Sequence, residues 1–490
     1  MKKLTITLFV LIILSLFLLF GFLSEINNQD KISKISKYTP SFLSKFLKET
    51  LFKIPLDLKY QKQAIIDLEI DLEEAKNFSD SLVLKFRDNI DQINFSRNQN
   101  FLINDSFLKK HNFKIFKTDY LINPKNIGKS SFYLESDNDN IYIMSADGMI
   151  LYFNKDKINS ENFNAFQIKS NFMDLVQDER VYKISKVGVK DILIDGKNLY
   201  VSYNKKIDND CYTNSILRAD LNFSYLNFET FFSSKECVKV KNEYGLFVGN
   251  QSGGRIVKYK DNKLLFSSGE YRNRLLAQND ESIFGKILLI DINTRDVKIF
   301  SKGHRNPQGL YYDINDDVIL STEHGPAGGD EINRVIKDKN YGWPIASYGI
   351  HYKCADRDKT LKNKKPVKIK NCKYKNLSNS PLYKSHKDHN FEEPLTYYDL
   401  SIAISEIIQI PNTIFSNKNK NYFVGALGTN IDEGDLSLHH IILDSSHLKV
   451  INRKIYKVYD RIRDLKFIDT HKIVIMSLDN NAAIGVLDLN

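Results

Sequence analysis

The stretch Asn140-Ile141-Tyr142-Ile143-Met144, followed after a short turn by Met149-Ile150-Leu151-Tyr152-Phe153, decides the fold of this chain. Both are short apolar segments separated by a turn cluster, which is the pattern of two successive antiparallel strands. Similar segments, most of them preceded by an Asp or Asn turn, recur at 197–201, 263–266 and 472–476. The recurrence predicts a repeated up-and-down β unit.

Six such units can be counted, starting near residues 131, 188, 253, 306, 402 and 462. A spacing of roughly 50 to 95 residues, with four short strands in each unit, is typical of propeller blades that carry variable insertions. We therefore predict an all-β fold, a six-bladed β-propeller over residues 126–490. A large sandwich or an open meander is the alternative. The propeller is favoured because radial repetition hides strand edges that a long meander would expose.

The first 24 residues have the composition of a membrane anchor. Met1-Lys2-Lys3 precedes the uncharged apolar run Leu4–Leu23, and about 20 such residues are enough to cross a bilayer as a helix. Lysines before the run and Glu25 after it favour a cytoplasmic N-terminus with the body outside. We expect residues 1–24 to be a retained transmembrane helix that holds the protein at the periplasmic face of the inner membrane. The alternative is a cleaved signal that leaves a secreted or periplasmic protein, although no small-residue cleavage pattern is present.

Residues 25–125 are polar and irregular, and we assign them to a stalk or small accessory region. The whole chain is 42% hydrophobic and 27% charged, which excludes disordered and fibrous classes. Its net charge of +10 invites a nucleic-acid partner. The lysines reflect a bias of the whole sequence rather than a basic patch, so we expect no nucleic-acid partner.

The four cysteines form two pairs of sequence neighbours, Cys211 with Cys237 and Cys354 with Cys372. An even count suits an exported body, and we expect two local disulfides, although the sequence alone allows three connectivities. Neither spacing resembles a structural zinc site. The second pair lies in the lysine-rich insertion 353–387, which we expect to be a solvated surface loop.

Three polar loops follow one another closely: Gly303–Gly309 (GHRNPQG), Glu323–Asn333 (EHGPAGGDEIN) and Asn340–Pro344 (NYGWP). In each, Gly and Pro fix the backbone while His, Arg, Asn, Glu or Asp crowd together. Backbone carbonyls beside a Gly-Pro pair, with acids nearby, suit a hard cation such as Ca²⁺. The Arg-Asn pair offers a fork donor and an amide to a carboxylate ligand. The alternative interpretation is a set of turn glycines and loop-bracing salt bridges.

In this order the three motifs resemble the soluble, PQQ-dependent glucose and aldose sugar dehydrogenases, the glucose/sorbosone dehydrogenase family. The resemblance is close from about Gly249 to Tyr352, recurs at Asp460–Asp464 (DRIRD) and does not extend to residues 1–125. It implies a six-bladed propeller, an oxidoreductase that oxidises the C1 hydroxyl of a sugar, and PQQ and Ca²⁺ as cofactors. It also implies an electron acceptor, a cytochrome or a quinone, which the sequence does not identify.

The resemblance also implies roles for single residues. Gly325 and Pro326 match the pair whose backbone carbonyls hold the catalytic Ca²⁺, with His324 in the adjoining ligand position. Arg305 and Asn306 match cofactor contacts.

Arg461 and Arg463 match two arginines that bind the carboxylates of PQQ. PQQ is a flat tricarboxylate ortho-quinone, so arginine forks would neutralise and orient it, while Ca²⁺ would polarise a quinone carbonyl. On a strand, residues at i and i+2 face the same side, as one ligand requires. Two solvated edge charges are the alternative. Gly269-Glu270 matches a family segment near a metal or the cofactor rim.

Two positions depart from the family pattern. Gln251, four residues before Arg255, occupies the position of the histidine that takes the proton from the sugar C1 hydroxyl. An amide cannot act as a base near neutral pH, and losing a positioned base typically costs about 10²–10⁴-fold in rate. At the second position, Gly428 replaces the lysine expected to reach the cofactor.

Three functions are therefore open. The first is a PQQ- and Ca²⁺-dependent sugar dehydrogenase whose usual base is replaced. The second is a catalytically inactive propeller that binds a sugar or a partner protein. The third is a lactonase-like hydrolase that uses metal-bound water. The presence of all four cofactor-contact residues favours an anionic cofactor over the third.

Overall fold

The computed structural model describes residues 90–104, 110–118, 131–178, 188–208, 210–242, 245–247, 249–356, 367–369, 372, 379–415 and 418–490. They belong to one compact unit, Ile90–Asn490. The expected anchor at residues 1–24 and most of the expected stalk at 25–125 lie outside the described residues. Among the residues that are described, no helix is long and apolar enough to cross a membrane.

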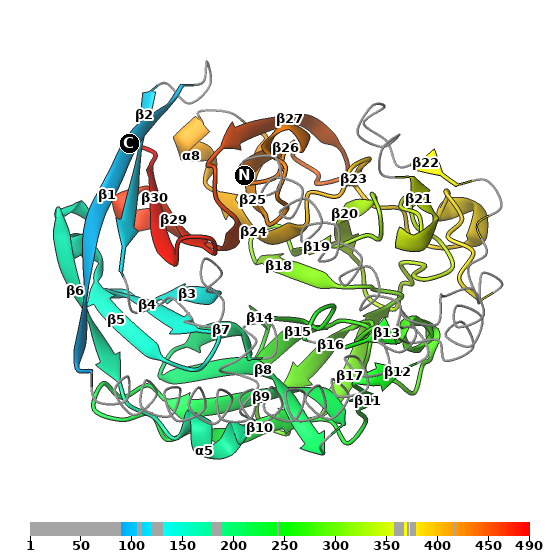
Figure 1. Cartoon of the computed structure of the whole chain (residues 1–490), viewed down its shortest axis with the longest axis horizontal. Helices are drawn as coiled ribbons and strands as arrows, with labels where there is room; N and C mark the ends of the chain where they lie inside the picture. Colours follow the sequence, from blue (N-terminus) through cyan, green and yellow to red (C-terminus); the bar gives the residue numbers. More distant parts are fainter. Residues whose placement is uncertain are drawn as a thin grey trace, which may run out of the picture. The chain divides into compact units, whose positions relative to one another are not determined.

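Antiparallel strands dominate this unit, and most described strands fall into six groups of four (Figure 1). The first three groups are β3 (Phe132–Ser136), β4 (Asn140–Ser145), β5 (Ile150–Asn154) and β6 (Asn162–Ile168); β7 (Val189–Asp195), β8 (Asn198–Asp208), β9 (Cys211–Asp220) and β10 (Glu229–Ser233); and β14 (Gly253–Tyr259), β15 (Lys263–Ser268), β16 (Lys286–Asp291) and β17 (Val297–Lys302). The other three are β18 (Pro307–Asp313), β19 (Val318–Glu323), β20 (Asp330–Val335) and β23 (Thr396–Tyr398); β24 (Ile404–Ile410), β25 (Lys420–Ala426), β26 (Ser437–Leu443) and β27 (Val450–Lys457); and β28 (Ile462–Ile468), β29 (Ile473–Leu478), β30 (Ala483–Asp488) and β2 (Lys110–Lys117).

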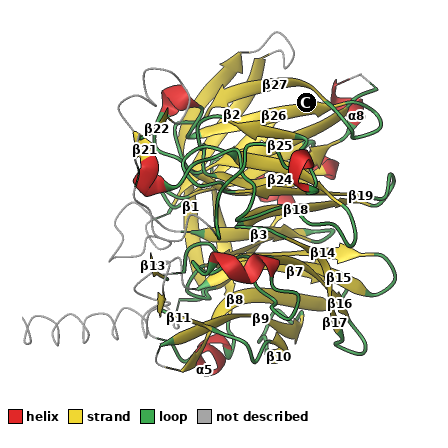
Figure 2. Cartoon of the chain, turned by 90° about the vertical axis from the view of Figure 1, so that its right-hand side faces the viewer, coloured by secondary structure: helices red, strands yellow, loops and turns green. Residues whose placement is uncertain are grey.

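The first strands of the six groups pack against one another in a closed ring. β3 contacts β7, β7 contacts β14, β14 contacts β18, β18 contacts β24, β24 contacts β28, and β28 contacts β3. Such radial repetition is the arrangement of a β-propeller. The predicted all-β propeller fold is therefore confirmed. The described helices are short, such as α5 (Phe172–Val176) and α8 (Asn412–Phe415) (Figure 2).

Strands buried on both faces explain the apolar runs of the sequence. All six residues of β29 are buried, and so are all seven of β26. A strand covered on both faces needs apolar side chains at successive positions rather than at every second one. These runs therefore come from neighbouring blades that cover both faces of each sheet.

The strand β1 (Gln92–Asn104) joins the first and last blades. It pairs with β6 on one side and with β2 on the other, and β2 pairs with β30, which gives a continuous nine-stranded sheet. Ile93 and Phe95 of β1 and Phe113 of β2 are fully buried. The compact unit thus begins at Ile90, earlier than the expected boundary at residue 126, because these alternating apolar side chains pack into the outer blades.

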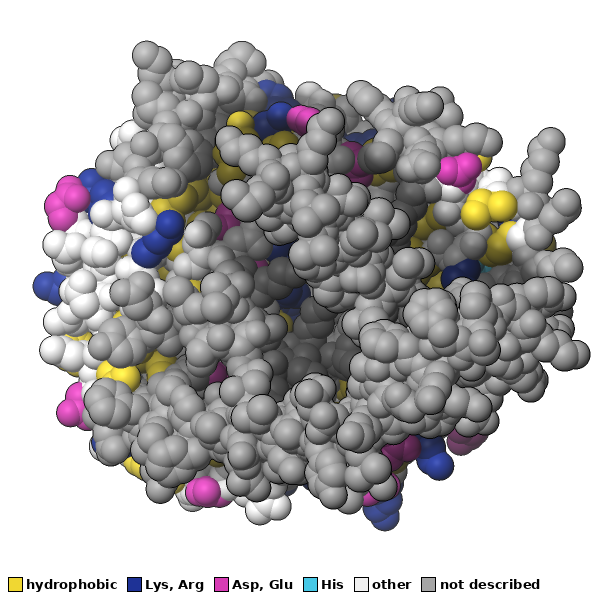
Figure 3. Space-filling model, viewed as in Figure 1, with side chains coloured by type: hydrophobic (Ala, Val, Ile, Leu, Met, Phe, Trp, Pro, Cys, Tyr) yellow, Lys and Arg dark blue, Asp and Glu magenta, His cyan; other side chains and the backbone are white. Residues whose placement is uncertain are grey.

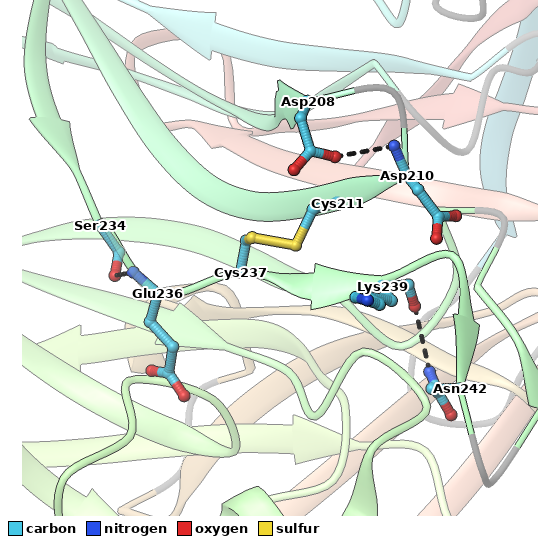
Figure 4. Close-up of a disulfide and its surroundings, with 8 residues drawn as sticks. All are labelled: Asp208, Asp210, Cys211, Ser234, Glu236, Cys237, Lys239 and Asn242. Carbon is cyan, nitrogen blue, oxygen red and sulfur yellow. Dashed lines mark hydrogen bonds between the residues drawn. A yellow bond between two sulfur atoms is a disulfide. The ribbon is translucent and has the colours of Figure 1, made fainter.

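Both expected local disulfides are present, Cys211–Cys237 and Cys354–Cys372. The first ties β9 to the segment that precedes β11 (Val238–Lys239), which also pairs with β9 (Figure 4). The pairing of sequence neighbours is therefore confirmed.

A single guanidinium links the inner strands near the centre of the ring. Nη1 of Arg255 on β14 lies 3.0 Å from Asp191 on β7, 2.9 Å from Glu406 on β24 and 2.7 Å from Asp464 on β28. Its Nε and Nη2 donate to the carbonyls of Gln308 and Arg463. We call Arg255 with Asp191, Glu406 and Asp464 the central cluster. It holds three carboxylates against one cation, all buried.

Candidate functional site

The three polar loops meet at one end of the fourth blade. The register pairs Pro307 with Glu323 and Glu323 with Glu331, so the loops before β18, after β19 and before β20 lie side by side. They line a small, partly open pocket. Its walls are Gly303, Arg305, Glu323, His324, Gly325, Gly329, Glu331, Tyr341, Trp343, Ala346, Ser347 and His386. Basic side chains also lie in the hollow at the middle of the face in Figure 3.

A buried carboxylate braces these loops. Glu323 Oε1 lies 2.5 Å from His304 Nδ1, and Oε2 accepts the backbone N–H of Arg305 at 3.1 Å. Burial raises the pKa of Glu323, but the contacts with His304, the N–H of Arg305 and the amide of Asn333 together outweigh burial, so the net pKa is lowered. Glu323 therefore holds the loops rather than offering an unengaged carboxylate.

Arg305 is held rigidly in the pocket wall. Its Nη1 donates to the carbonyl of His324 at 2.8 Å. Its guanidinium carbon lies 5.2 Å from the ring centre of Trp343 and 5.9 Å from that of Tyr352, within the range of cation–π contacts. A guanidinium fixed in this way is preorganised for an anionic ligand.

His324 is a buried neutral imidazole close to several cations. Burial and the guanidinium groups of Arg305, Arg463 and Arg461 lower its pKa to about 3. Its Nε2 has no hydrogen-bond partner among the described residues. A buried polar nitrogen without a partner is costly in an empty pocket. The imidazole is therefore suited to meet a ligand atom or a metal ion.

Arg461 and Arg463 converge on one carboxylate, that of Asp479. Arg463 Nη2 donates to Asp479 Oδ2 at 2.7 Å, and Arg461 Nε lies 3.8 Å from the same oxygen. Burial and the like charge of Arg463 lower the pKa of Arg461. The carboxylates of Asp479, Asp460 and Asp435 oppose this fall without cancelling it. Both guanidinium groups lie on the same side of the chain, as the i, i+2 spacing predicts.

The Gly325-Pro326 turn is too tight for side chains. A Cβ added at Gly325 would lie 2.2 Å from the carbonyl oxygen of Gly329. The N–H of Gly325 donates to Asp330 Oδ1 at 2.9 Å, while the carbonyl of Pro326 accepts the Ser401 hydroxyl at 2.8 Å. Burial raises the pKa of Asp330 to about 6. Backbone carbonyls beside a buried carboxyl group form the kind of oxygen-rich donor set that Ca²⁺ accepts.

Asn306 and Gln251 connect the fourth blade to the third. Asn306 Oδ1 accepts the N–H of Gly253 at 3.2 Å and the side-chain amide of Gln308 at 3.0 Å. Gln251 has a left-handed backbone with φ 60°, and its carbonyl accepts the N–H of Tyr271 at 2.9 Å. The structure thus places Gln251 beside the turn that follows β15.

Gly428 stands where no side chain fits. A Cβ there would lie 2.0 Å from the carboxyl group of Asp435, which accepts the backbone N–H groups of Thr429 and Asn430. The carboxyl group of Asp435 therefore occupies the space that the side chain of the expected lysine would need.

Sequence reasoning missed the partners that hold the site, namely Asp479, the Glu323–His304 pair and the aromatic rings around Arg305. Of these residues, only Asp479 is indicated by a pattern in the sequence. Asp479 directly follows the apolar run of β29, and a carboxyl group at a strand end is a common position for a site residue. The others depend on contacts between separate loops.

The fold and the three loops together are similar to those expected from the glucose/sorbosone dehydrogenase resemblance. Residues 137–370 match the family model described as Glucose / Sorbosone dehydrogenase. The three motifs lie within this range. The resemblance predicted from the motifs is therefore confirmed.

Two curated relatives carry related names. The chain is 30% identical over 195 residues to the aldose sugar dehydrogenase YliI of Escherichia coli strain K12, which covers 37% of this chain and 46% of that protein. It is 29% identical over 130 residues to the quinoprotein glucose dehydrogenase B of Acinetobacter calcoaceticus, which covers 20% of this chain and 27% of that protein. The chain thus spans about half or less of the length of these relatives.

Solved structures support the fold. The crystal structure of the soluble aldose sugar dehydrogenase of Escherichia coli in its apo form superposes with a TM-score of 0.55 at 20% identity, over 74% of this chain and 97% of that one. A crystal structure of a glucose dehydrogenase gives 0.53 at 20% identity, over 73% and 95%.

Proposed function

We propose that this protein is a PQQ- and Ca²⁺-dependent aldose dehydrogenase that oxidises the C1 hydroxyl of a sugar. The observation that carries the proposal is the group of three guanidinium groups around His324. Arg305, Arg461 and Arg463 all depress the pKa of this one imidazole. Asp479 is the carboxylate that Arg461 and Arg463 share. A flat tricarboxylate matches that charge.

Each residue would have a distinct task. Arg461 and Arg463 would bind carboxylates of the cofactor, and Arg305, fixed by Trp343, would orient its plane. The carbonyls of Gly325 and Pro326, with the neutral His324 beside them, would face the cation. When bound, PQQ supplies a hydride acceptor, and Ca²⁺ supplies a Lewis acid at its carbonyl.

A catalytically inactive propeller that binds a sugar or a partner protein is the second candidate. Two observations favour it. Gln251 cannot accept a proton near neutral pH, and the packing of Asp435 against Gly428 leaves no room for the lysine that the family resemblance implies.

We also propose that the protein acts at the periplasmic face of the inner membrane and passes electrons to a cytochrome or a quinone. The two disulfides support this location, because disulfides persist in oxidising compartments. The apolar run at residues 4–23 supports attachment to the membrane.

The test is a titration of the purified full-length protein with PQQ, in Ca²⁺ and in chelator, followed by absorbance and melting temperature. We expect Ca²⁺-dependent binding that raises the melting temperature by mass action. Turnover of aldoses with an artificial electron acceptor should follow. No binding at PQQ concentrations on the order of tens of micromolar would exclude the dehydrogenase and leave the inactive propeller.

A further inference from the structure

Oxidation of an alcohol to a carbonyl compound moves a hydride from carbon and also releases the hydroxyl proton. Some group must take this proton, and a positioned side chain does so best when its pKa lies near the working pH. Gln251 cannot do it. The question is which described carboxyl group or imidazole near the pocket can.

Four groups in or beside the pocket are poor candidates for this base, because each is either held in hydrogen bonds or has a pKa far from neutral. Glu323 is paired with His304. Asp330 accepts backbone N–H groups of Gly325 and Ile404 on its two oxygens. His324 is too weak a base beside three arginines. Burial and the neighbouring carboxylates, above all Glu323, hold the pKa of Glu331 far above its usual range, so that group stays protonated.

Glu270 is a buried carboxyl group in a turn that contacts both Arg305 and Gln251. It lies in the turn after β15, and its N–H donates to the carbonyl of Arg305 at 2.9 Å. The N–H of the next residue, Tyr271, donates to the carbonyl of Gln251 at 2.9 Å. Gly269, on its other side, packs so closely that an added Cβ would lie 2.2 Å from the carbonyl oxygen of Gln251. The backbone therefore holds Glu270 directly beside position 251.

The side chain of Glu270 is buried and lies near two residues of the pocket wall. Its carboxyl group interacts with Arg305 and Trp343, which both line the pocket, and with Arg274 and Arg272 on the segment that follows. Burial raises its pKa, and the three arginines oppose the rise without cancelling it. A carboxyl group with these neighbours has a proton affinity nearer to neutral pH than an exposed glutamate.

We propose that Glu270 is the general base of this protein, taking the proton of the sugar C1 hydroxyl in place of a residue at position 251. This inference rests on the proposed dehydrogenase function. The C1–H bond breaks and its electron pair passes with the hydrogen to the ortho-quinone. The O–H bond breaks, its proton goes to the Glu270 carboxylate, and the C1=O bond of the lactone forms. The proton then moves from Glu270 to the reduced quinone, which leaves the quinol and the free carboxylate.

The test compares Glu270→Gln with the full-length wild type and with Glu281→Gln, which makes the same charge change beyond the helical turn that follows. We expect Glu270→Gln to bind PQQ with an affinity within about threefold of the wild type, whereas turnover falls about 10²–10⁴-fold. Glu281→Gln should keep the wild-type affinity for PQQ and the wild-type turnover. Adding Gln251→His to Glu270→Gln should restore part of the turnover, because it returns a base to the neighbouring position.

A second readout does not need turnover. Because the folded-state pKa of Glu270 is raised, the wild type without cofactor should lose stability relative to Glu270→Gln as the pH rises above the ordinary glutamate range. If Glu270→Gln fails to fold, Glu270→Asp should shift the acid limb of the kcat/KM profile and slow turnover.

The outcomes separate the two ideas. A Glu270→Gln or Glu270→Asp protein that binds PQQ and keeps the wild-type rate and pH profile overturns the inference but leaves the dehydrogenase in place. A wild type that binds no PQQ overturns the proposed function, and the role of Glu270 with it.

Discussion

At the scale of single residues, the candidate site is defined by three guanidinium groups that act on one buried imidazole, that of His324. Arg461 and Arg463 share the carboxylate of Asp479, which lies 2.7 Å from Arg463 Nη2 and 3.8 Å from Arg461 Nε. Arg461 is therefore the residue with the most to gain from an anionic ligand. Its contact with Asp479 is too long to be a strong hydrogen bond.

Replacing Arg461 with glutamine should weaken PQQ binding about 10- to 100-fold, the range expected for losing one charge-assisted hydrogen bond. The fold should lose little, because the substitution also removes repulsion between Arg461 and Arg463. Titration of each protein with PQQ measures the change. Arg453→Gln on the outer strand β27 is the matched control and should leave the affinity unchanged. Equal affinities for the two variants would remove Arg461 from the site.

The sequence reveals most of the residues that line the pocket but not how they are held. Arg305, His324 and Gly325 lie in compact motifs, where a few neighbouring letters fix the backbone. The contact of Gly428 with Asp435 depends instead on how one loop folds back on itself. The position of Glu270 depends on a turn that packs against residue 251. Spacing along the chain does not encode such contacts.

At the scale of elements, β1 and β2 hold the outer edges of the first and last blades together. Phe116 of β2 is fully buried, and its ring lies 5.1 Å from that of Phe163 on β6. β1 and β2 therefore join the two blades by apolar packing as well as by backbone hydrogen bonds.

Phe116→Ala should lower the free energy of unfolding by about 3–5 kcal/mol, the usual cost of truncating a buried phenylalanine. Urea denaturation followed by circular dichroism measures it. Lys114→Ala, a partly exposed position on the same strand, is the control and should change stability by well under 1 kcal/mol. If both variants lose the same small amount, the hairpin does not stabilise the blades.

The blade strands were predictable because each pairs with its neighbour in sequence across a short turn. The strands of residues 140–154 show this most clearly. The pairing of β2 could not be predicted, because its partner β30 lies far along the chain and no local sequence pattern indicates such a pairing. The strands β1 and β2 therefore fall within the expected stalk, residues 25–125, although stretches such as 92–96 alternate apolar and polar side chains as strands do.

At the scale of the whole molecule, the central cluster makes stability depend on pH. Burial raises the pKa of Asp191 to about 7 and that of Glu406 to about 8. Folded protein thus keeps protons that unfolded chain releases near the ordinary carboxyl pKa of about 4. The contribution of Asp191 and Glu406 to stability is therefore fully present below a pH of about 4. It is lost as the pH rises through 7 and 8.

We expect the melting temperature to fall steadily between about pH 5 and pH 9, by an amount that corresponds to a few kcal/mol. Glu406→Gln removes one titrating group and should flatten the fall. Calorimetry at constant ionic strength measures both curves. Glu229→Gln, an exposed carboxylate on β10, should leave the slope as in the wild type. A fall that Glu406→Gln does not alter would assign the pH dependence to other groups.

The nine-stranded sheet also sets the order of events when the chain is made. Phe113 of β2 is paired with Leu487 of β30, more than 370 residues later. At the usual synthesis rate of about 5–20 residues per second, β2 is finished roughly 20 to 75 s before its partner exists. During that interval one edge of the hairpin has no native neighbour. The sheet is therefore completed only after β30 has been synthesised and pairs with β2.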